Sequence, residues 1–261
     1  NVMRVSLLPG LLMAAARNIQ RRTLRIQLYE MGRCFVRGAD SAIRQDWHLA
    51  FLVSGMRTEE QWGSAQSTMD YYDLKGDLTQ MLGPAIAEQL TYQPLNEVDL
   101  PPFNVAAFHP GQSAAIYLAG NCVGVLGKIH PAFVDMLGVA QDTWLCEWFN
   151  PYVFFSGKIA GMDSLSKFPS MRRDLSFWVD DETTYQKMAD VIRQAAGEQL
   201  TELTLFDVYE DKKRADKRKS FSWSMHFQDM KRTLTDQEIQ QHVMSVIDAV
   251  EVACNAQIRS E

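Results

Sequence analysis

Residues that could contact nucleic acid gather in the last third of this 261-residue chain. Positions 212–219 hold six lysines and arginines in eight residues, although the whole chain carries a formal net charge of −6. Such a run is either an electrostatic contact for a phosphate backbone or a solvated loop. The basic run alone does not distinguish these two readings, so the residues around it have to be considered. From Lys167 onward the chain has 14 basic and 17 acidic residues and thus no general basic field.

Arginines at 172 and 173, followed by Asp174, begin the alternating segment "RRDLSFWVD". The planar guanidinium of arginine forms paired hydrogen bonds with phosphates and with base edges, so Arg172 and Arg173 are candidate RNA contacts. The alternative is a charged entry to a strand, with an exposed Arg–Asp pair that contributes less than about 1 kcal/mol.

Asp207 and Tyr209 are two residues apart in "LFDVY", so a strand places both on one side, with Phe206 and Val208 on the other. A carboxylate can accept hydrogen bonds from the Watson–Crick edge of guanine, and a tyrosine ring can stack on an unpaired base. The alternative is a turn-capping aspartate and a core tyrosine. The apolar pattern changes parity at Leu205 and Phe206, as it would at a β-bulge or where the environment of the strand changes.

The second part of the chain reads as alternating strands and helices. Thr183 with Gln186, and Thr235 with Glu238, have the spacing of capping boxes at helix N-termini. We predict a strand at 172–180, a helix at 183–196, strands at 201–210 and 221–228, a helix from 235 to about 250 and a short strand at 256–259. This β-α-β-β-α-β order is that of the ferredoxin-like split βαβ fold.

The segment "FSWSMHFQ" alternates strictly between large apolar and polar residues. We expect both helices to cover the apolar row, which leaves the opposite sheet face free for a partner. That face would carry Ser222, Ser224, His226 and Gln228, with His226 as an ordinary surface histidine. RNA-recognition modules bind bases on such an open sheet, but the same fold also hosts regulatory and enzymatic domains.

Residues 1–155 predict an α+β unit with a mostly antiparallel sheet. The linker that follows, 156–166, is poor in large apolar residues and contains two glycines. Within the unit we predict helices at 8–19 and 71–83, strands at 25–37 and 47–56, a hairpin turning at Gly120 and Asn121, and a last strand at 144–155.

Several classes of site are not indicated by the sequence. The four cysteines are widely scattered, with no CxxC pair, and the five histidines form no HExxH motif, so we expect no metal site and thiols kept in a reducing compartment. No nucleophile–base constellation or P-loop is visible. No run of 18 apolar residues occurs, which argues against a membrane span. The abrupt start of the chain favours a fragment of a longer polypeptide.

The motifs also resemble those of a known family. "FPSMRRDLSF", "LFDVY", "KS" at 219–220 and "RTLTDQEI" resemble the ferredoxin-fold anticodon-binding domain that closes the β subunit of bacterial phenylalanyl-tRNA synthetase. "VMRVSLLPGLL", "LYEMGRCF", "YYDLKGDL" and "HPGQSAAIYLAGNCVGVLGKIHP" resemble the catalytic-like module before it. The resemblance covers nearly the whole chain in the right order.

The resemblance implies a division of labour. Residues 1–155 would form a class II synthetase-like module that supports the catalytic α subunit without catalysing, and 167–261 a ferredoxin-like anticodon-binding domain. The partners would be tRNA-Phe and the α subunit in a cytoplasmic α2β2 enzyme, without membrane or DNA. ATP and Mg²⁺ would serve the whole enzyme, and we expect no cofactor in this fragment.

The resemblance also implies an RNA site. The tRNA-Phe anticodon is GAA, so a guanine-reading carboxylate is chemically sensible. Each lysine that contacts a phosphate of single-stranded RNA would add about 0.7 to the salt slope, which is the steepness with which the logarithm of the binding constant falls with the logarithm of the salt concentration. In the alternative reading, the chain is a non-catalytic assembly module whose ferredoxin-like half contacts protein. The predicted tRNA-binding residues are Arg172, Arg173, Asp207, Tyr209, Lys219 and Arg232.

Overall fold

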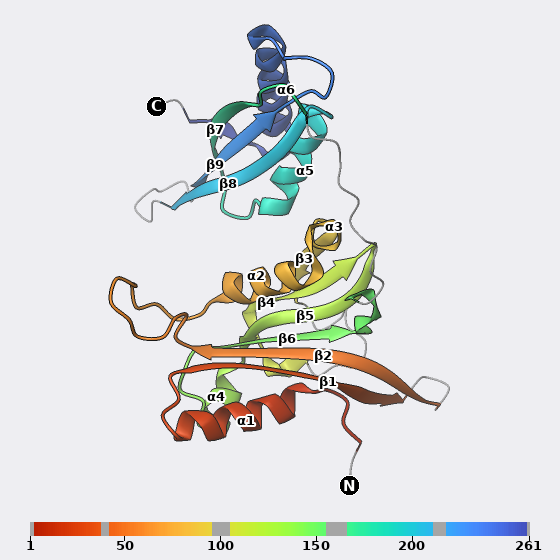
Figure 1. The fold of residues 1–261 in the computed structure, drawn as a ribbon, viewed down its shortest axis with the longest axis vertical. Helices are drawn as coiled ribbons and strands as arrows, with labels where there is room; N and C mark the ends of the chain where they lie inside the picture. The colour runs from red at the N-terminus through yellow and green to blue at the C-terminus, as the bar shows by residue number, and fades with distance from the viewer. Residues whose placement is uncertain (1–2, 38–41, 96–104, 155–165, 211–217, 260–261) are drawn as a thin grey trace. The chain divides into compact units, whose positions relative to one another are not determined.

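The chain forms two compact units, residues 1–160 and 161–261 (Figure 1). The computed structural model describes residues 3–37, 42–95, 105–154, 166–210 and 218–259. Most of the predicted linker and residues 212–217 of the basic run lie outside the described residues. None of the helices in the described ranges is both long and apolar enough to cross a membrane.

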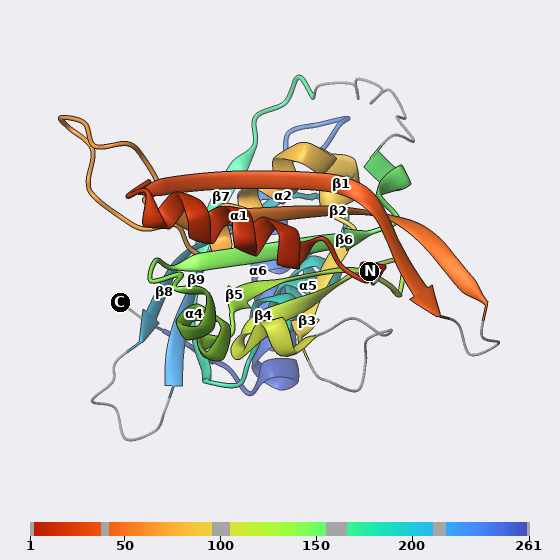
Figure 2. The same ribbon diagram turned by 90° about the horizontal axis from the view of Figure 1, so that it is seen from below.

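The first unit contains a six-stranded sheet in the order β1-β2-β6-β5-β4-β3, in which every neighbouring pair is antiparallel. One core packs α1 and α4 against one face, and a second core packs α2 against the other (Figure 2). The elements are α1 (Leu8–Gln20), β1 (Arg25–Arg37), β2 (Ile43–Gly55), α2 (Tyr71–Leu82), α3 (Pro84–Ala87), β3 (Leu90–Pro94), η1 (Val105–Ala107), β4 (Phe108–Leu118), β5 (Asn121–Ile129), α4 (Pro131–Leu137), β6 (Thr143–Phe149) and η2 (Pro151–Phe154).

The predicted last strand of this unit is too long. β6 ends at Phe149, and a 3-10 turn follows. Asn150 has a left-handed φ of 54°, and the next residue, Pro151, has no N–H to continue the ladder. These two residues therefore end the strand where apolar content alone had predicted that it continued to position 155.

A buried carboxylate joins the sheet of the first unit to α1. Glu147 in β6 is 2% exposed, and its Oε1 lies 2.8 Å from Nδ1 of His48 in β2. The same carboxylate accepts hydrogen bonds from the Leu7 backbone N–H at 3.0 Å and from the Ser6 hydroxyl at 2.5 Å. Since Leu7, the N-cap residue of α1, has no capping side-chain hydrogen bond of its own, Glu147 supplies the missing acceptor from across the sheet.

The second unit contains a four-stranded sheet in the order β10-β7-β9-β8, again antiparallel throughout. One core packs both helices against the face that carries Phe221, Trp223, Met225 and Phe227. This confirms the α+β class and the ferredoxin-like order. The elements are β7 (Met171–Asp180), α5 (Tyr185–Ala196), β8 (Leu200–Glu210), β9 (Arg218–Phe227), α6 (Asp236–Cys254) and β10 (Gln257–Ile258).

One of the two predicted capping boxes is present. Thr235 and Glu238 exchange both hydrogen bonds at the start of α6. The first prediction, at Thr183, is wrong, because α5 starts one residue later and Thr184 is its N-cap residue, accepting from the Lys187 N–H at 3.2 Å. The third helical position is then Lys187, which cannot return the hydrogen bond.

We expect Glu147→Ala to lower the free energy of unfolding of the first unit by about 3 to 5 kcal/mol, because the change leaves His48 and the start of α1 without their buried partner. Hydrogen exchange with mass spectrometry would resolve the two units by their peptides. Protection should fall in β2, β6 and α1 and stay unchanged in α5 and α6. Glu88→Ala, at an exposed position, is the matched control and should change stability by less than about 0.5 kcal/mol. Equal effects of the two substitutions would contradict the anchoring role of Glu147.

Candidate nucleic-acid interface

The candidate interface is the sheet face of the second unit that lies opposite the helices, called here the open face. Its central strand, β9, contributes Ser222 and Ser224, each 4% exposed. The expectation that these serines are free for a partner is wrong. They are short, and they lie in register between larger residues of β7 and β8, such as Asp174 and Thr204 on either side of Ser224. The surface of the open face is therefore formed by its flanking strands.

A β-bulge in β8 shapes one part of this surface. The register passes from Leu205 opposite Trp223 to Asp207 opposite Ser222, which leaves Phe206 as the extra residue. Of the two explanations for the change of parity, the structure shows the bulge. The Phe206 ring lies 5.9 Å from the guanidinium carbon of Arg172 and is 52% exposed. Its predicted place on the side opposite Asp207 is wrong, since the two residues of a bulge share one partner and the alternation is interrupted there.

Arg172 is held on the open face by Asp174. Its Nε donates to Asp174 Oδ1 at 2.8 Å, and its Nη2 donates to Oδ2 at 2.9 Å. The hydrogen bond from Arg172 lowers the pKa of the Asp174 carboxyl, and the same pairing raises the pKa of Arg172. The guanidinium therefore faces Phe206 in a fixed orientation, with one edge occupied by a carboxylate.

Two further aromatic rings meet over the short side chain of Ser220. The Trp178 and Tyr209 ring centroids are 6.2 Å apart, edge to face, and both residues are in register with Ser220. The guanidinium carbon of Arg259 lies 5.3 Å from the Trp178 ring centroid and 5.6 Å from that of Tyr209. Asp207, on the same strand as Tyr209 and at the same parity, is exposed. The face thus combines exposed rings, cations and a carboxylate, as single-stranded RNA sites do.

The other three predicted residues are not part of this surface. Arg173 alternates to the helix side of β7 and pairs with Asp236 at 2.9 Å. Lys219 donates from Nζ to the Asp181 carbonyl at 2.5 Å and lies 5.1 Å from the Phe221 ring centroid, on the helix side as well. Arg232 forms a double ion pair with Glu238 at the start of α6. Strand alternation separates Arg172 from Arg173, whereas Arg172, Asp207 and Tyr209 come together.

Three residues of the open face were not among those predicted from the sequence. Trp178 has the same parity as Arg172 in β7, so alternation alone could have identified it. Phe206 required knowing which way a bulge turns its extra residue. Arg259 follows β10 and reaches the open face only because β10 pairs with β7, a contact between distant parts of the chain.

The first unit has one group of side chains with metal-binding atoms among its described residues, namely Cys34, His48 and Glu147, within 4.8 Å of one another. The 2.8 Å between His48 and Glu147 is the length of a direct hydrogen bond, and the second Glu147 oxygen accepts from Ser6. Burial raises the pKa of the Cys34 thiol to about 12, which disfavours the thiolate that binds metals. The three side chains therefore form a buried cluster held by hydrogen bonds.

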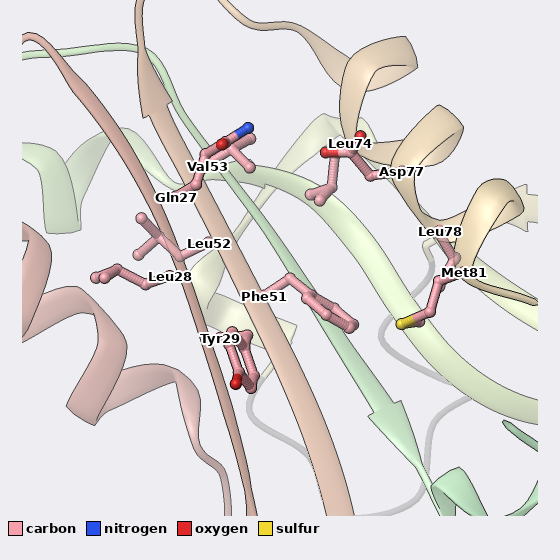
Figure 3. Close-up of a pocket in the computed structure, with 10 residues that line it drawn as sticks. All are labelled: Gln27, Leu28, Tyr29, Phe51, Leu52, Val53, Leu74, Asp77, Leu78 and Met81. Carbon is pink, nitrogen blue, oxygen red and sulfur yellow. The ribbon is translucent and has the colours of Figure 1, made fainter. Parts of the chain in front are cut away.

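The first unit also contains an apolar pocket of about 290 Å³ between its first two strands and α2 (Figure 3). Phe51 and Met81 point toward one another across it, Tyr29 also lines it, and Asp77 is its one carboxylate, with a pKa raised by burial. Tyr29 is 75% exposed. The lining residues that the structure describes offer an apolar contact surface and include no nucleophile–base pair.

Comparisons with known proteins agree for both units. The family model described as "Phenylalanyl tRNA synthetase beta chain CLM domain" matches residues 1–148, and the model "Ferredoxin-fold anticodon binding domain" matches residues 166–259. The phenylalanine–tRNA ligase beta subunit of Xanthomonas oryzae pv. oryzae is 37% identical over 99% of this chain and 32% of its own length. That of Pseudomonas savastanoi pv. phaseolicola is 36% identical over 98% of this chain and 31% of its own length.

The chain thus spans about a third of the length of these curated relatives. Among solved structures, the crystal structure of pyrrolysyl-tRNA synthetase from Desulfitobacterium hafniense matches with a TM-score of 0.41 and 13% identity, covering 58% of this chain and 48% of that one. This similarity is too low to support a conclusion.

Whether Arg232 is engaged by Glu238 can be measured through the carboxyl pKa. The hydrogen bond from Arg232, followed by those from Thr235, lowers the Glu238 pKa from 4.5 to about 2. Because the folded pKa lies below the ordinary one, ionised Glu238 stabilises the start of α6 fully above about pH 4.5, and this stabilisation is lost as the pH falls toward 2. We expect Arg232→Gln to raise the Glu238 pKa, and Lys231→Gln to leave it nearly unchanged, in carboxyl NMR titrations. Equal pKa values in all three proteins would show that Arg232 is not held there.

Proposed function

The chain belongs to the phenylalanyl-tRNA synthetase β-chain family, and from this membership we propose that it is the part of a phenylalanine–tRNA ligase β subunit that binds the anticodon region of tRNA-Phe. The observation that carries the proposal is the open face of the second unit. There, Arg172, Asp207 and Tyr209 share one surface with Trp178 and Phe206. Rings can stack on anticodon bases, and the exposed carboxylate of Asp207 can accept hydrogen bonds from guanine.

The first unit has a different part in this proposal. We propose that it is a non-catalytic module that packs against the catalytic α subunit of an α2β2 enzyme in the cytoplasm. Its sheet and its apolar pocket support this role. ATP and Mg²⁺ would be bound elsewhere in that enzyme, where phenylalanine is activated and attached to tRNA. This chain would contribute to the reaction by holding the tRNA and by supporting the α subunit.

We expect the chain to bind a tRNA-Phe anticodon stem-loop weakly and salt-dependently, and more tightly than an unrelated stem-loop of the same length. Gel shift or NMR titration at low salt would measure both affinities. Asp207→Ala should reduce the preference for the tRNA-Phe loop by about tenfold, because one charged hydrogen-bonding group to a base is lost. Asp248→Ala removes the same charge from an exposed position on α6 and should leave the preference unchanged. Equal affinities of the wild-type chain for the two loops would contradict anticodon reading by this chain.

A second candidate function, assembly without RNA contact, is favoured by the exposed apolar pocket of the first unit. The two candidates differ in the complete enzyme. If the second unit reads RNA, Asp207→Ala should impair aminoacylation while the α subunit is still captured in a pull-down. If the chain acts in assembly alone, Asp207→Ala should leave both aminoacylation and capture intact.

A further inference from the structure

Three strands of the second unit bring one aromatic and cationic cluster together, made of Trp178, Tyr209 and Arg259. Trp178 comes from β7, Tyr209 from β8, and Arg259 directly follows β10. The rings meet edge to face at 6.2 Å, and the guanidinium carbon lies within 5.3 Å of one ring centroid and 5.6 Å of the other. The three residues are far apart in the sequence, so the sheet alone brings them together.

The position of Arg259 is fixed at both ends of the residue. Its backbone N–H donates to the Ser176 carbonyl at 2.7 Å, which extends the β10–β7 ladder by one residue. Its Nη1 donates to the Ser220 hydroxyl at 3.4 Å, beneath the two rings. A guanidinium can make a cation–π contact with each of the two rings while donating a hydrogen bond at its edge, whereas an ammonium group can act only as a point charge.

Arg259 also differs from the neighbouring arginines in that no described carboxylate forms an ion pair with it. Around the sheet, Arg172 pairs with Asp174, and Arg218 with Asp180 at 3.3 Å. Among the ion pairs between described residues, none involves Arg259. Tyr209 remains 46% exposed even though its ring contacts Trp178 and Arg259. The cluster therefore presents an oriented ring beside a cation that these carboxylates do not neutralise.

We infer that Arg259 is a positioning residue: between Trp178 and Tyr209 it fixes the Tyr209 ring so that one unpaired base of single-stranded RNA stacks on it. This inference rests on the proposed function and adds to it the way in which one base is held. The ligand that this cluster fits is an unpaired base next to a phosphate. The base would stack on the Tyr209 ring, and the positive charge of the Arg259 guanidinium would attract the anionic backbone.

The test uses the whole chain and anticodon stem-loops that carry a single abasic site at each loop position in turn. In the wild-type chain, one abasic position should weaken binding about tenfold, because one base–ring stack is lost. Arg259→Lys keeps the charge but not the planar group, so the same abasic site should now change affinity less than about twofold. The salt slope should not change, since a lysine still meets the backbone. Tyr209→Leu should behave like Arg259→Lys, and Arg193→Lys, at an exposed position on α5, like the wild type.

A measurement without RNA separates this inference from the proposed function. In NMR spectra of the free chain, Arg259→Lys should shift the Tyr209 ring resonances and leave the α5 and α6 amides in place, which also reports that the variant is folded. Unshifted Tyr209 resonances, or an abasic penalty that Arg259→Lys retains, would overturn the positioning role while a preference for the tRNA-Phe loop could still stand. A wild-type chain that binds no stem-loop would overturn both proposals together.

Discussion

The alternation of large and short side chains along β9 is the constraint on which the candidate interface depends. Phe221, Trp223, Met225 and Phe227 are buried against both helices, so the residues between them must point to the open face. Those residues are serines in the middle of the strand, and their small size lets side chains from β7 and β8 meet above them. A larger residue at Ser220 would separate Trp178 from Tyr209 and occupy the space that Arg259 uses. The core and the open face are thus specified by the same strand.

The first unit is organised by a buried polar contact instead. Removing a carboxylate from water is costly unless it is fully paired, and Glu147 meets this requirement with a histidine, a backbone N–H and a hydroxyl. The histidine comes from β2, and the other two donors come from the adjacent residues Ser6 and Leu7 at the start of α1. The carboxylate is therefore satisfied only when β2, β6 and the start of α1 are in their final places. Such a contact favours one arrangement of α1 over others more strongly than apolar packing, which tolerates sliding.

Most of the fold could be predicted from the sequence, because periodicity and parity are local properties. The alternation of apolar and polar residues predicted β7 and β9, and the break in this alternation indicated the position of the bulge in β8. Two of the failures depended on one residue more or less: Thr184 caps α5 in place of Thr183, and Phe206 turns to the open face. Arg259 was missed for another reason, since it reaches the open face only through the pairing of β10 with β7. No pattern within either segment indicates which distant strand it will meet.

The balance of charge explains how an acidic chain could still offer a site for RNA. The two described residues at the end of the basic run, Arg218 and Lys219, are engaged by Asp180 and by the Asp181 carbonyl, so neither is a free phosphate contact in this arrangement. Because most cations near the sheet have a partner of their own, a long-range attraction would be weak. Recognition would then depend on a few oriented groups acting at contact distance, which favours selection among bases over general affinity for a backbone.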